Sequence, residues 1–168
     1  MKFTKILLLS TFIFLSSILN VFSQGASSGN GLYIASVFNE NSSNYISIHK
    51  FSTKDFIKKL EFDVKNTSEI DTLYFNYNGN LICAKQGINY FIWNVLTGKQ
   101  IAKIISATQI LLANNEDFYL VLKSNVITKY DGSSATELLK YTSPYNQVIS
   151  NIKLSPKDDF IAGSNGLD

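Results

Sequence analysis

Few residues in this sequence have the types and spacing that catalysis or metal binding requires. His49 is the only histidine and Cys83 the only cysteine. A Ser-His-Asp triad or a Cys-His pair could therefore be built only around His49. Zinc needs three or four nitrogen or sulfur ligands, so no metal site is expected. We interpret His49 as a packing or edge residue at the end of a strand, and the sequence indicates no catalytic or cofactor-binding residue.

Two adjacent carboxylate pairs, Glu116-Asp117 and Asp158-Asp159, are the other candidates for chemistry. Neighbouring strand residues point to opposite faces of a sheet, so neither pair would converge on one substrate atom. Aspartate is favoured in turns, where both pairs are expected to fall. The sequence has no D-x-D-x-D-G calcium pattern. We interpret both pairs as turn residues and expect no cofactor.

The first residues resemble a secretory signal peptide. Lys2 and Lys5 precede an apolar run over residues 6–19, and the small residues Val21 and Ser23 suit cleavage after Ser23. An uncleaved membrane anchor is the alternative, because the run over 6–22 is at the lower limit of bilayer-spanning length. We expect a secreted, periplasmic or cell-surface protein that is not stably inserted in a membrane after cleavage.

Removal of the signal changes the charge balance. All 15 cationic side chains are lysines, two of which lie in the signal, whereas all 13 carboxylates follow it. The exported chain is formally neutral, so a nucleic-acid partner is not expected. Cys83 alone can form no internal disulfide, and we interpret it as a small buried thiol.

Residues 24–31 are rich in small residues and read as a linker. From Leu32 onward the chain shows apolar runs of four to seven residues separated by turn-forming residues, which predicts an all-β protein. In the best-defined segment we expect strands near 70–75, 80–84, 89–94 and 99–105, with turns at Asn78-Gly79 and Thr97-Gly98.

The chain also aligns with itself. Residues 73–89 match residues 152–168 without a gap, residues 73–94 match 110–131, and residues 48–60 match 92–104. A period of roughly 40 residues with four short strands per copy is typical of a β-propeller blade. We therefore expect four-stranded antiparallel blades at about 32–65, 66–106 and 107–146, and an incomplete one at 147–168.

The segment "NYNGNLICAKQGINYFIWNVLTGKQIAKI" resembles a WD-repeat blade, with Trp93-Asn94 in place of the family's Trp-Asp pair. The corresponding pairs are Tyr130-Asp131 and His49-Lys50, and no Gly-His pair precedes any copy. These departures leave a related propeller type as an alternative to strict membership. The resemblance implies structural roles for the repeat positions Trp93, Asn94, Gly79, Gly98, Tyr130, Asp131, Pro156 and Gly163.

The repeats also predict an incomplete propeller. A closed propeller has about four to eight blades, and Asp168 falls before the third and fourth strands of the fourth copy. We expect these residues to be the N-terminal part of a longer protein, with an apolar sheet face exposed at the open end.

Other side chains have structural interpretations. Lys54, Lys58 and Lys59 predict a solvated outer strand that protects a sheet edge. Most aromatic residues recur at blade spacing and read as core, whereas Phe38, Tyr141 and Tyr145 lie near expected loops. Two acceptor motifs for N-glycosylation, at Asn41 and Asn66, also lie in expected loops.

The leading functional hypothesis is an exported, non-catalytic propeller that binds a protein or peptide partner. Its contact loops would be 39–45, 63–69, 85–89, 122–125 and 142–148, at one end of the blades. One alternative is an accessory or catalytic propeller domain of a larger secreted enzyme, such as a hydrolase or a lactonase-like or quinoprotein-like catalyst. Another is a surface protein without a specific ligand. Fold alone does not discriminate among these classes.

Overall fold

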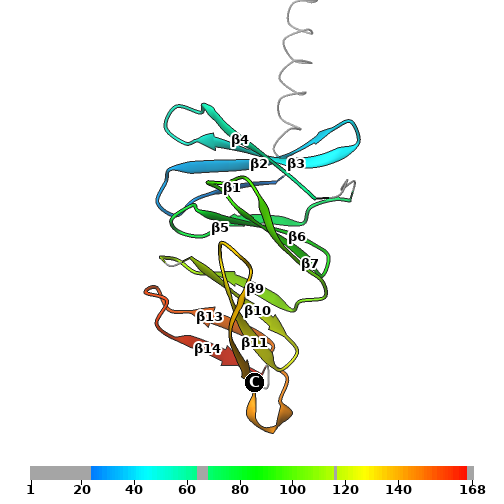
Figure 1. Ribbon diagram of the computed structural model, residues 1–168, viewed down its shortest axis with the longest axis vertical. Coiled ribbons are helices and arrows are strands. Elements are labelled where there is room, and N and C mark those ends of the chain that lie inside the picture. The colour runs from blue at the N-terminus through cyan, green and yellow to red at the C-terminus, as the bar shows by residue number, and fades with distance from the viewer. Residues whose placement is uncertain (1–23, 64–67, 116, 166–168) are drawn as a thin grey trace, which may run out of the picture.

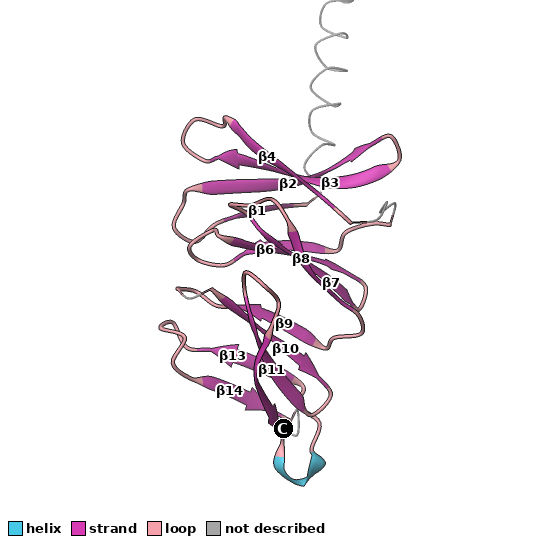
Figure 2. Cartoon of the chain, viewed as in Figure 1, coloured by secondary structure: helices cyan, strands magenta, loops and turns pink. Residues whose placement is uncertain are grey.

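A computed structural model describes residues 24–63, 68–115 and 117–165 of the chain. The expected signal peptide, Asn66 and Glu116 lie outside the described residues. Within the described ranges the chain is built from strands and a single 3-10 turn, Pro144–Asn146 (Figure 2). The expected all-β fold class is thereby confirmed.

The described strands form three four-stranded antiparallel sheets and one two-stranded sheet, and the strands of each sheet are ordered as in the sequence. The first sheet contains β1 (Gly25–Ser27), β2 (Tyr33–Glu40), β3 (Ser43–Lys50) and β4 (Phe56–Glu61). The second contains β5 (Thr72–Phe75), β6 (Leu81–Gln86), β7 (Asn89–Asn94) and β8 (Gln100–Ile104). The third contains β9 (Gln109–Leu112), β10 (Phe118–Lys123), β11 (Val126–Asp131) and β12 (Glu137–Thr142), and the fourth contains β13 (Asn151–Leu154) and β14 (Ile161–Ser164).

The sheets stack face to face along the long axis of the molecule (Figure 1). Their strands are apolar on both faces where a sheet has two neighbours: Leu81, Ile82, Cys83 and Ala84 of β6 are all fully buried. Alternate residues point to opposite faces, so Ile82 and Ala84 join the core shared with the first sheet and Leu81 and Cys83 the core shared with the third. A third core lies between the third and fourth sheets.

The same turn chemistry recurs in every sheet. The residue that begins the first turn of each sheet donates its backbone N–H to the carbonyl of the residue five positions later, at Ser28/Tyr33, Asn76/Leu81, Ala113/Phe118 and Ser155/Phe160. Between the third and fourth strands, Lys54, Gly98 and Ala135 each adopt a positive φ and donate to the residue four positions earlier. A bulge precedes this turn in all three complete sheets. Positions that the sequence alignment pairs are thus locally alike.

The expected linker needs correction, because residues 24–31 contain β1. Gly25, Ala26 and Ser27 pair with Ser36, Ala35 and Ile34 of β2, so the first sheet begins before residue 32. Backbone hydrogen bonds hold this strand, and only Ala26 packs against the core. Its small side chains give no apolar pattern, which is why composition predicted a linker.

Candidate functional site

His49, the residue around which histidine chemistry could have been built, is bound to its own sheet. It lies in β3, as expected, and its ring nitrogens contact Ser47 Oγ at 2.6 Å and the Lys54 carbonyl at 3.1 Å. Its ring also packs edge-on against Phe56. In the part of the chain that the structure describes, no three His, Cys, Asp or Glu side chains form a group that could hold a metal ion.

Two aspartates in turn regions, Asp158 and Asp131, act as hydrogen-bond acceptors. Asp158 accepts hydrogen bonds from the backbone N–H groups of Asn114, at 2.9 Å, and Asn115, at 2.6 Å. Asp131 accepts from the hydroxyl and backbone N–H groups of Ser133 and Ser134. These hydrogen bonds lower the pKa of Asp131 well below its usual value. The interpretation of Asp158 as a turn residue is confirmed.

Asp117 lies near Asp131, at the end of the third sheet that carries the first turn. Its backbone carbonyl accepts from Gly132 N at 2.8 Å, and its side chain accepts from Asn80 Nδ2 at 3.5 Å. Partial burial, followed by the charge of Asp131, raises the pKa of Asp117. The two carboxylates are held by separate turn contacts, so their arrangement serves turn structure.

Cys83 and its tyrosine neighbours form a buried cluster between the second and third sheets. Burial raises the pKa of the Cys83 thiol to about 12, so the thiolate that reacts with electrophiles is scarce near neutral pH. Burial also raises the pKa of Tyr74, whose hydroxyl donates to the Ile110 carbonyl at 3.1 Å. The expectation of a small buried thiol is confirmed, and this cluster is core.

The residues expected to be structural repeat positions lie in the core, in turns or within a strand. Trp93 is fully buried, donates from Nε1 to the Glu61 carbonyl at 2.8 Å and packs edge-on against Phe62. Tyr130 stacks on Tyr119. Gly79 and Gly98 both have φ of +76°, which glycine adopts without strain. The remaining positions are Asn94, which accepts from Thr97 N, Pro156, whose carbonyl accepts from Asn115, and Gly163, which lies within β14.

A row of asparagines joins the first turns of successive sheets. The side-chain amide of Asn30 donates to the Asn78 carbonyl at 2.8 Å, and that of Asn78 donates to the Asn115 carbonyl at 3.2 Å. Asn115 in turn donates to the Pro156 carbonyl at 2.8 Å. We call these residues, Asn30, Asn78 and Asn115, the asparagine ladder. Sequence reasoning missed it because asparagine is a common turn residue in its own right.

The described parts of the loops that were expected to share one end of the sheets contact one another. Asn44 Nδ2 donates to the Ser68 carbonyl at 2.5 Å, and Gln86 Nε2 donates to the Glu69 carbonyl at 3.2 Å. Ser124 O accepts from Ile149 N at 3.0 Å. The hairpin turns β2–β3, β6–β7 and β10–β11 are therefore next to the connections between sheets. The β2–β3 turn is shorter than the expected loop 39–45. Only Asn41 and Ser42, both with positive φ, lie between the two strands.

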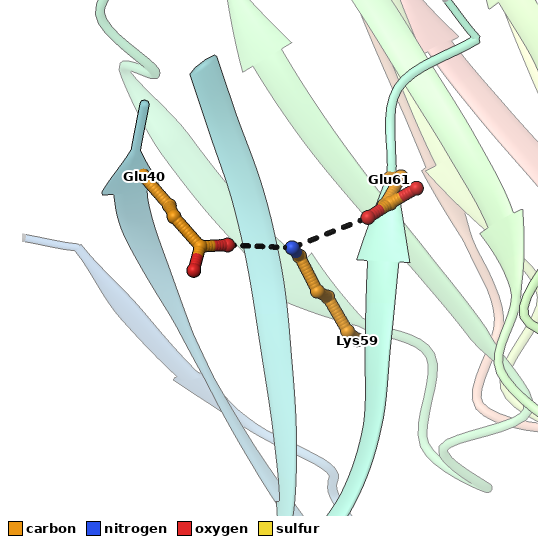
Figure 3. Close-up of polar contacts among 3 residues, drawn as sticks. All are labelled: Glu40, Lys59 and Glu61. Carbon is orange, nitrogen blue, oxygen red and sulfur yellow. Dashed lines mark hydrogen bonds and ion pairs between the residues drawn. The ribbon is translucent and has the colours of Figure 1, made fainter. Parts of the chain in front are cut away.

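Lys59, in the outer strand of the first sheet, forms two ion pairs (Figure 3). Lys59 Nζ lies 2.7 Å from Glu40 Oε2 and 3.2 Å from Glu61 Oε1, and it sits 4.4 Å from the centre of the Tyr45 ring. The hydrogen bond to Glu40 raises the pKa of Lys59. This lysine is engaged by its own sheet, and Lys58 donates to the Leu96 carbonyl of the next one. The expected solvated outer strand is confirmed.

An apolar groove of about 620 Å³ lies between β12 and the fourth sheet. Leu139 and Tyr141 line it and are 63% and 52% exposed. Tyr141 was singled out in the sequence, whereas Leu139 was not, because nothing in β12 itself indicates whether another strand covers it. Phe38, singled out with Tyr141, stacks on Tyr45 instead.

No protein-family model matches the chain, and no curated protein matches it either. Among the described residues, no helix has the length and apolar character needed to cross a membrane.

Proposed function

We propose that this chain belongs to a β-propeller and acts as an exported, non-catalytic scaffold that binds a protein or peptide partner. The arrangement of the first strands supports the propeller, because the first strands of adjacent blades line its centre. β1 lies against β5. Tyr74 of β5 bonds to Ile110 of β9, and Gln109 of β9 bonds to Ile152 of β13.

The observation that carries the scaffold function is the contrast between the candidate chemical groups and the turn-rich end. His49, Cys83, Asp131 and Asp158 are each engaged in the packing or hydrogen bonding of a sheet or turn. The turns β2–β3, β6–β7 and β10–β11 and the connections beside them instead form one continuous surface. Loops presented on a rigid scaffold are the usual place for recognition. We call this surface the loop end.

Site-specific cross-linking tests the loop-end assignment. A photoreactive side chain is placed at Asn41 or Ser124 on the loop end, and at Thr53 or Ser133 on the opposite end as a matched control. All four residues are exposed. We expect an adduct with a defined protein from the host's exported fraction only from loop-end positions, and we expect excess unlabelled chain to suppress it. Equal adducts from both ends would contradict the proposal.

Export is tested separately by N-terminal sequencing of the chain recovered from its host. A mature chain that begins at Gln24 is the expected result. Recovery of an intact N-terminus in the membrane fraction would instead favour the uncleaved anchor.

A further inference from the structure

Two of the three ladder asparagines are followed by glycine, whereas Asn115 is followed by glutamate. Asn30-Gly31 and Asn78-Gly79 lie at equivalent places in the first turns of the first and second sheets. Both glycines have a positive φ, of +70° and +76°. Because glycine has no Cβ, its backbone nitrogen can closely approach the side chain of the residue before it. An Asn-Gly pair therefore permits attack of that nitrogen on the side-chain amide.

This reaction consumes water and releases ammonia. The Gly79 nitrogen loses its proton to hydroxide and bonds to Cγ of Asn78, and Nδ2 leaves as ammonia. Water then opens the resulting cyclic imide. Opening at Cγ leaves aspartate with an ordinary backbone, whereas opening at the backbone carbonyl carbon leaves isoaspartate, in which the chain runs through Cγ. Either product carries a carboxylate in place of the amide.

The fold holds the two asparagine side chains to different degrees. Both residues are half-buried, so access to water does not separate them. Oδ1 of Asn30 accepts hydrogen bonds from Ser28 Oγ at 2.8 Å and from Leu32 N at 3.1 Å. Its Nδ2 donates to the Asn78 carbonyl at 2.8 Å. Among the described residues, the side chain of Asn78 is held only by its bond to the Asn115 carbonyl, at 3.2 Å.

The two glycines are held alike at their backbone nitrogens. Gly31 N donates to the Ser28 carbonyl at 3.0 Å, and Gly79 N donates to the Asn76 carbonyl at 3.2 Å. Gly79 also packs against the Tyr33 ring, whereas Gly31 faces open space. That packing resists movement of Gly79, but the carbon that has to move belongs to the asparagine side chain. The side-chain hydrogen bonds therefore decide which pair reacts.

We propose that Asn78 is a self-modification site in the folded chain, where it cyclises with Gly79 and ends as isoaspartate and aspartate, while Asn30 is protected. The products lack the amide that donates to the Asn115 carbonyl, so the ladder opens between the second and third sheets. Isoaspartate also lengthens the backbone beside Gly79, where an added Cβ would lie 2.7 Å from the Tyr33 ring. The joint between these sheets thus weakens with age. This site does not depend on the proposed loop-end function.

Peptide mapping of the aged full chain tests the proposal. The chain is kept folded at mildly alkaline pH, digested at intervals and analysed by mass spectrometry, after chromatography that separates aspartate from isoaspartate. We expect the products to accumulate at least about tenfold faster at Asn78 than at Asn30, because more hydrogen bonds have to break at Asn30. Equal rates, a faster reaction at Asn30, or no reaction at either position would overturn the proposal.

The same measurement in urea shows whether the fold causes the difference. Both asparagines precede glycine, so the unfolded chain should modify Asn30 and Asn78 at similar rates. A preference for Asn78 that persists undiminished in urea would come from the local sequence and would overturn the proposal.

Ser28→Ala tests the protecting contacts directly. It removes the hydrogen bond from Ser28 Oγ to Asn30 and should raise the rate at Asn30 roughly fivefold, with the rate at Asn78 unchanged. Ser27→Ala, at an exposed serine of β1, is the matched control and should change neither rate. An unchanged rate at Asn30 in the Ser28 variant, or equal changes at both asparagines, would overturn the proposal.

The consequence for the stack is measured with Asn78→Gln. This variant keeps an amide, but its longer side chain would have to close a larger ring, so it should resist modification. After the same incubation, urea unfolding should reveal a less stable fraction in the unaltered chain and not in the variant. An aged chain that is modified at Asn78 and keeps its original stability would overturn the proposed opening of the ladder.

Discussion

Leu60 of β4 pairs with Ile46 of β3, and Tyr141 of β12 pairs in the same way with Ile127 of β11. The two residues occupy equivalent positions in the first and third sheets, and their surroundings differ. Leu60 is fully buried beneath β7, whereas Tyr141 is 52% exposed beside the groove. Both positions carry a large, largely apolar side chain, so the residue type alone does not create the difference. The difference shows that burial of an outer strand in a stack of sheets is decided by its neighbour.

The largest effect should come from the side chain that fills the covered interface. Trp93→Ala removes a fully buried ring and its hydrogen bond to Glu61. We expect the free energy of unfolding to fall by about 3–5 kcal/mol, as for other large buried aromatics. Urea unfolding followed by circular dichroism measures it. Trp93→Phe should lose less, and a loss below about 1 kcal/mol in the alanine variant would contradict the comparison.

A direct test compares the two equivalent positions. Leu60→Ala should cost about 2–5 kcal/mol because it leaves a cavity. Tyr141→Ala should change stability by less than about 0.5 kcal/mol because the side chain is half exposed. The same urea titration serves for both. Similar losses in the two variants would show that Tyr141 is buried in solution.

The asparagine ladder should contribute less than either core residue. Asn78→Ala removes the amide that donates to the Asn115 carbonyl at 3.2 Å. We expect a loss of about 1 kcal/mol, typical of one hydrogen bond. Asn78→Asp keeps the side chain's shape but replaces the donor with an acceptor, so it should destabilise at least as much. If the aspartate variant were as stable as the unaltered chain, the amide would not be the contributing group.

The smallest predicted effect is on the stability of the fold at low pH. Asp131 can ionise, whereas Asn94, the residue at the equivalent position of the second sheet, cannot. Because folding lowers the pKa of Asp131, the ionised carboxylate stabilises the fold above its ordinary pKa of about 3.9. That contribution is lost as the pH falls through the lower, folded pKa. The melting temperature of Asp131→Asn should therefore fall less steeply between about pH 5 and pH 2.

The matched control for this pH series is Asp159→Asn, which removes an exposed turn carboxylate and leaves Asp131 in place. It should keep the pH dependence of the unaltered chain. An identical slope in all three proteins would show that the turn hydrogen bonds of Asp131 do not contribute to acid stability.

Local sequence patterns were sufficient for much of this fold. Apolar runs and turn residues located the strands of the second sheet to within about two residues, the usual uncertainty of element boundaries. The turns at Gly79 and Gly98 were predictable because glycine is favoured where a turn requires a positive φ, and both residues have one. β1 was not predictable, since Gly25, Ala26 and Ser27 are held by backbone pairing rather than by apolar side chains.

The candidate surfaces were predictable in kind but not in detail. Tyr141 stood out because it lies near an expected loop. The participation of Leu139 depends on the position of β14, a contact between strands distant in sequence. The asparagine ladder likewise depends on a distance between neighbouring turns. Such spatial relations become visible only when the sheets are stacked.

The ladder also gives the stack a direction. Each asparagine donates toward the C-terminal neighbour, so one sheet presents a donor where the next presents an acceptor. Further sheets that continue this pattern would be arranged head-to-tail. A two-fold axis could not relate neighbouring sheets, because one supplies the donor and the other the acceptor. Heterologous contacts of this kind close into a ring when the rotation per unit divides the circle, and otherwise continue as an open helix. The rotation between successive sheets thus decides between ring and filament.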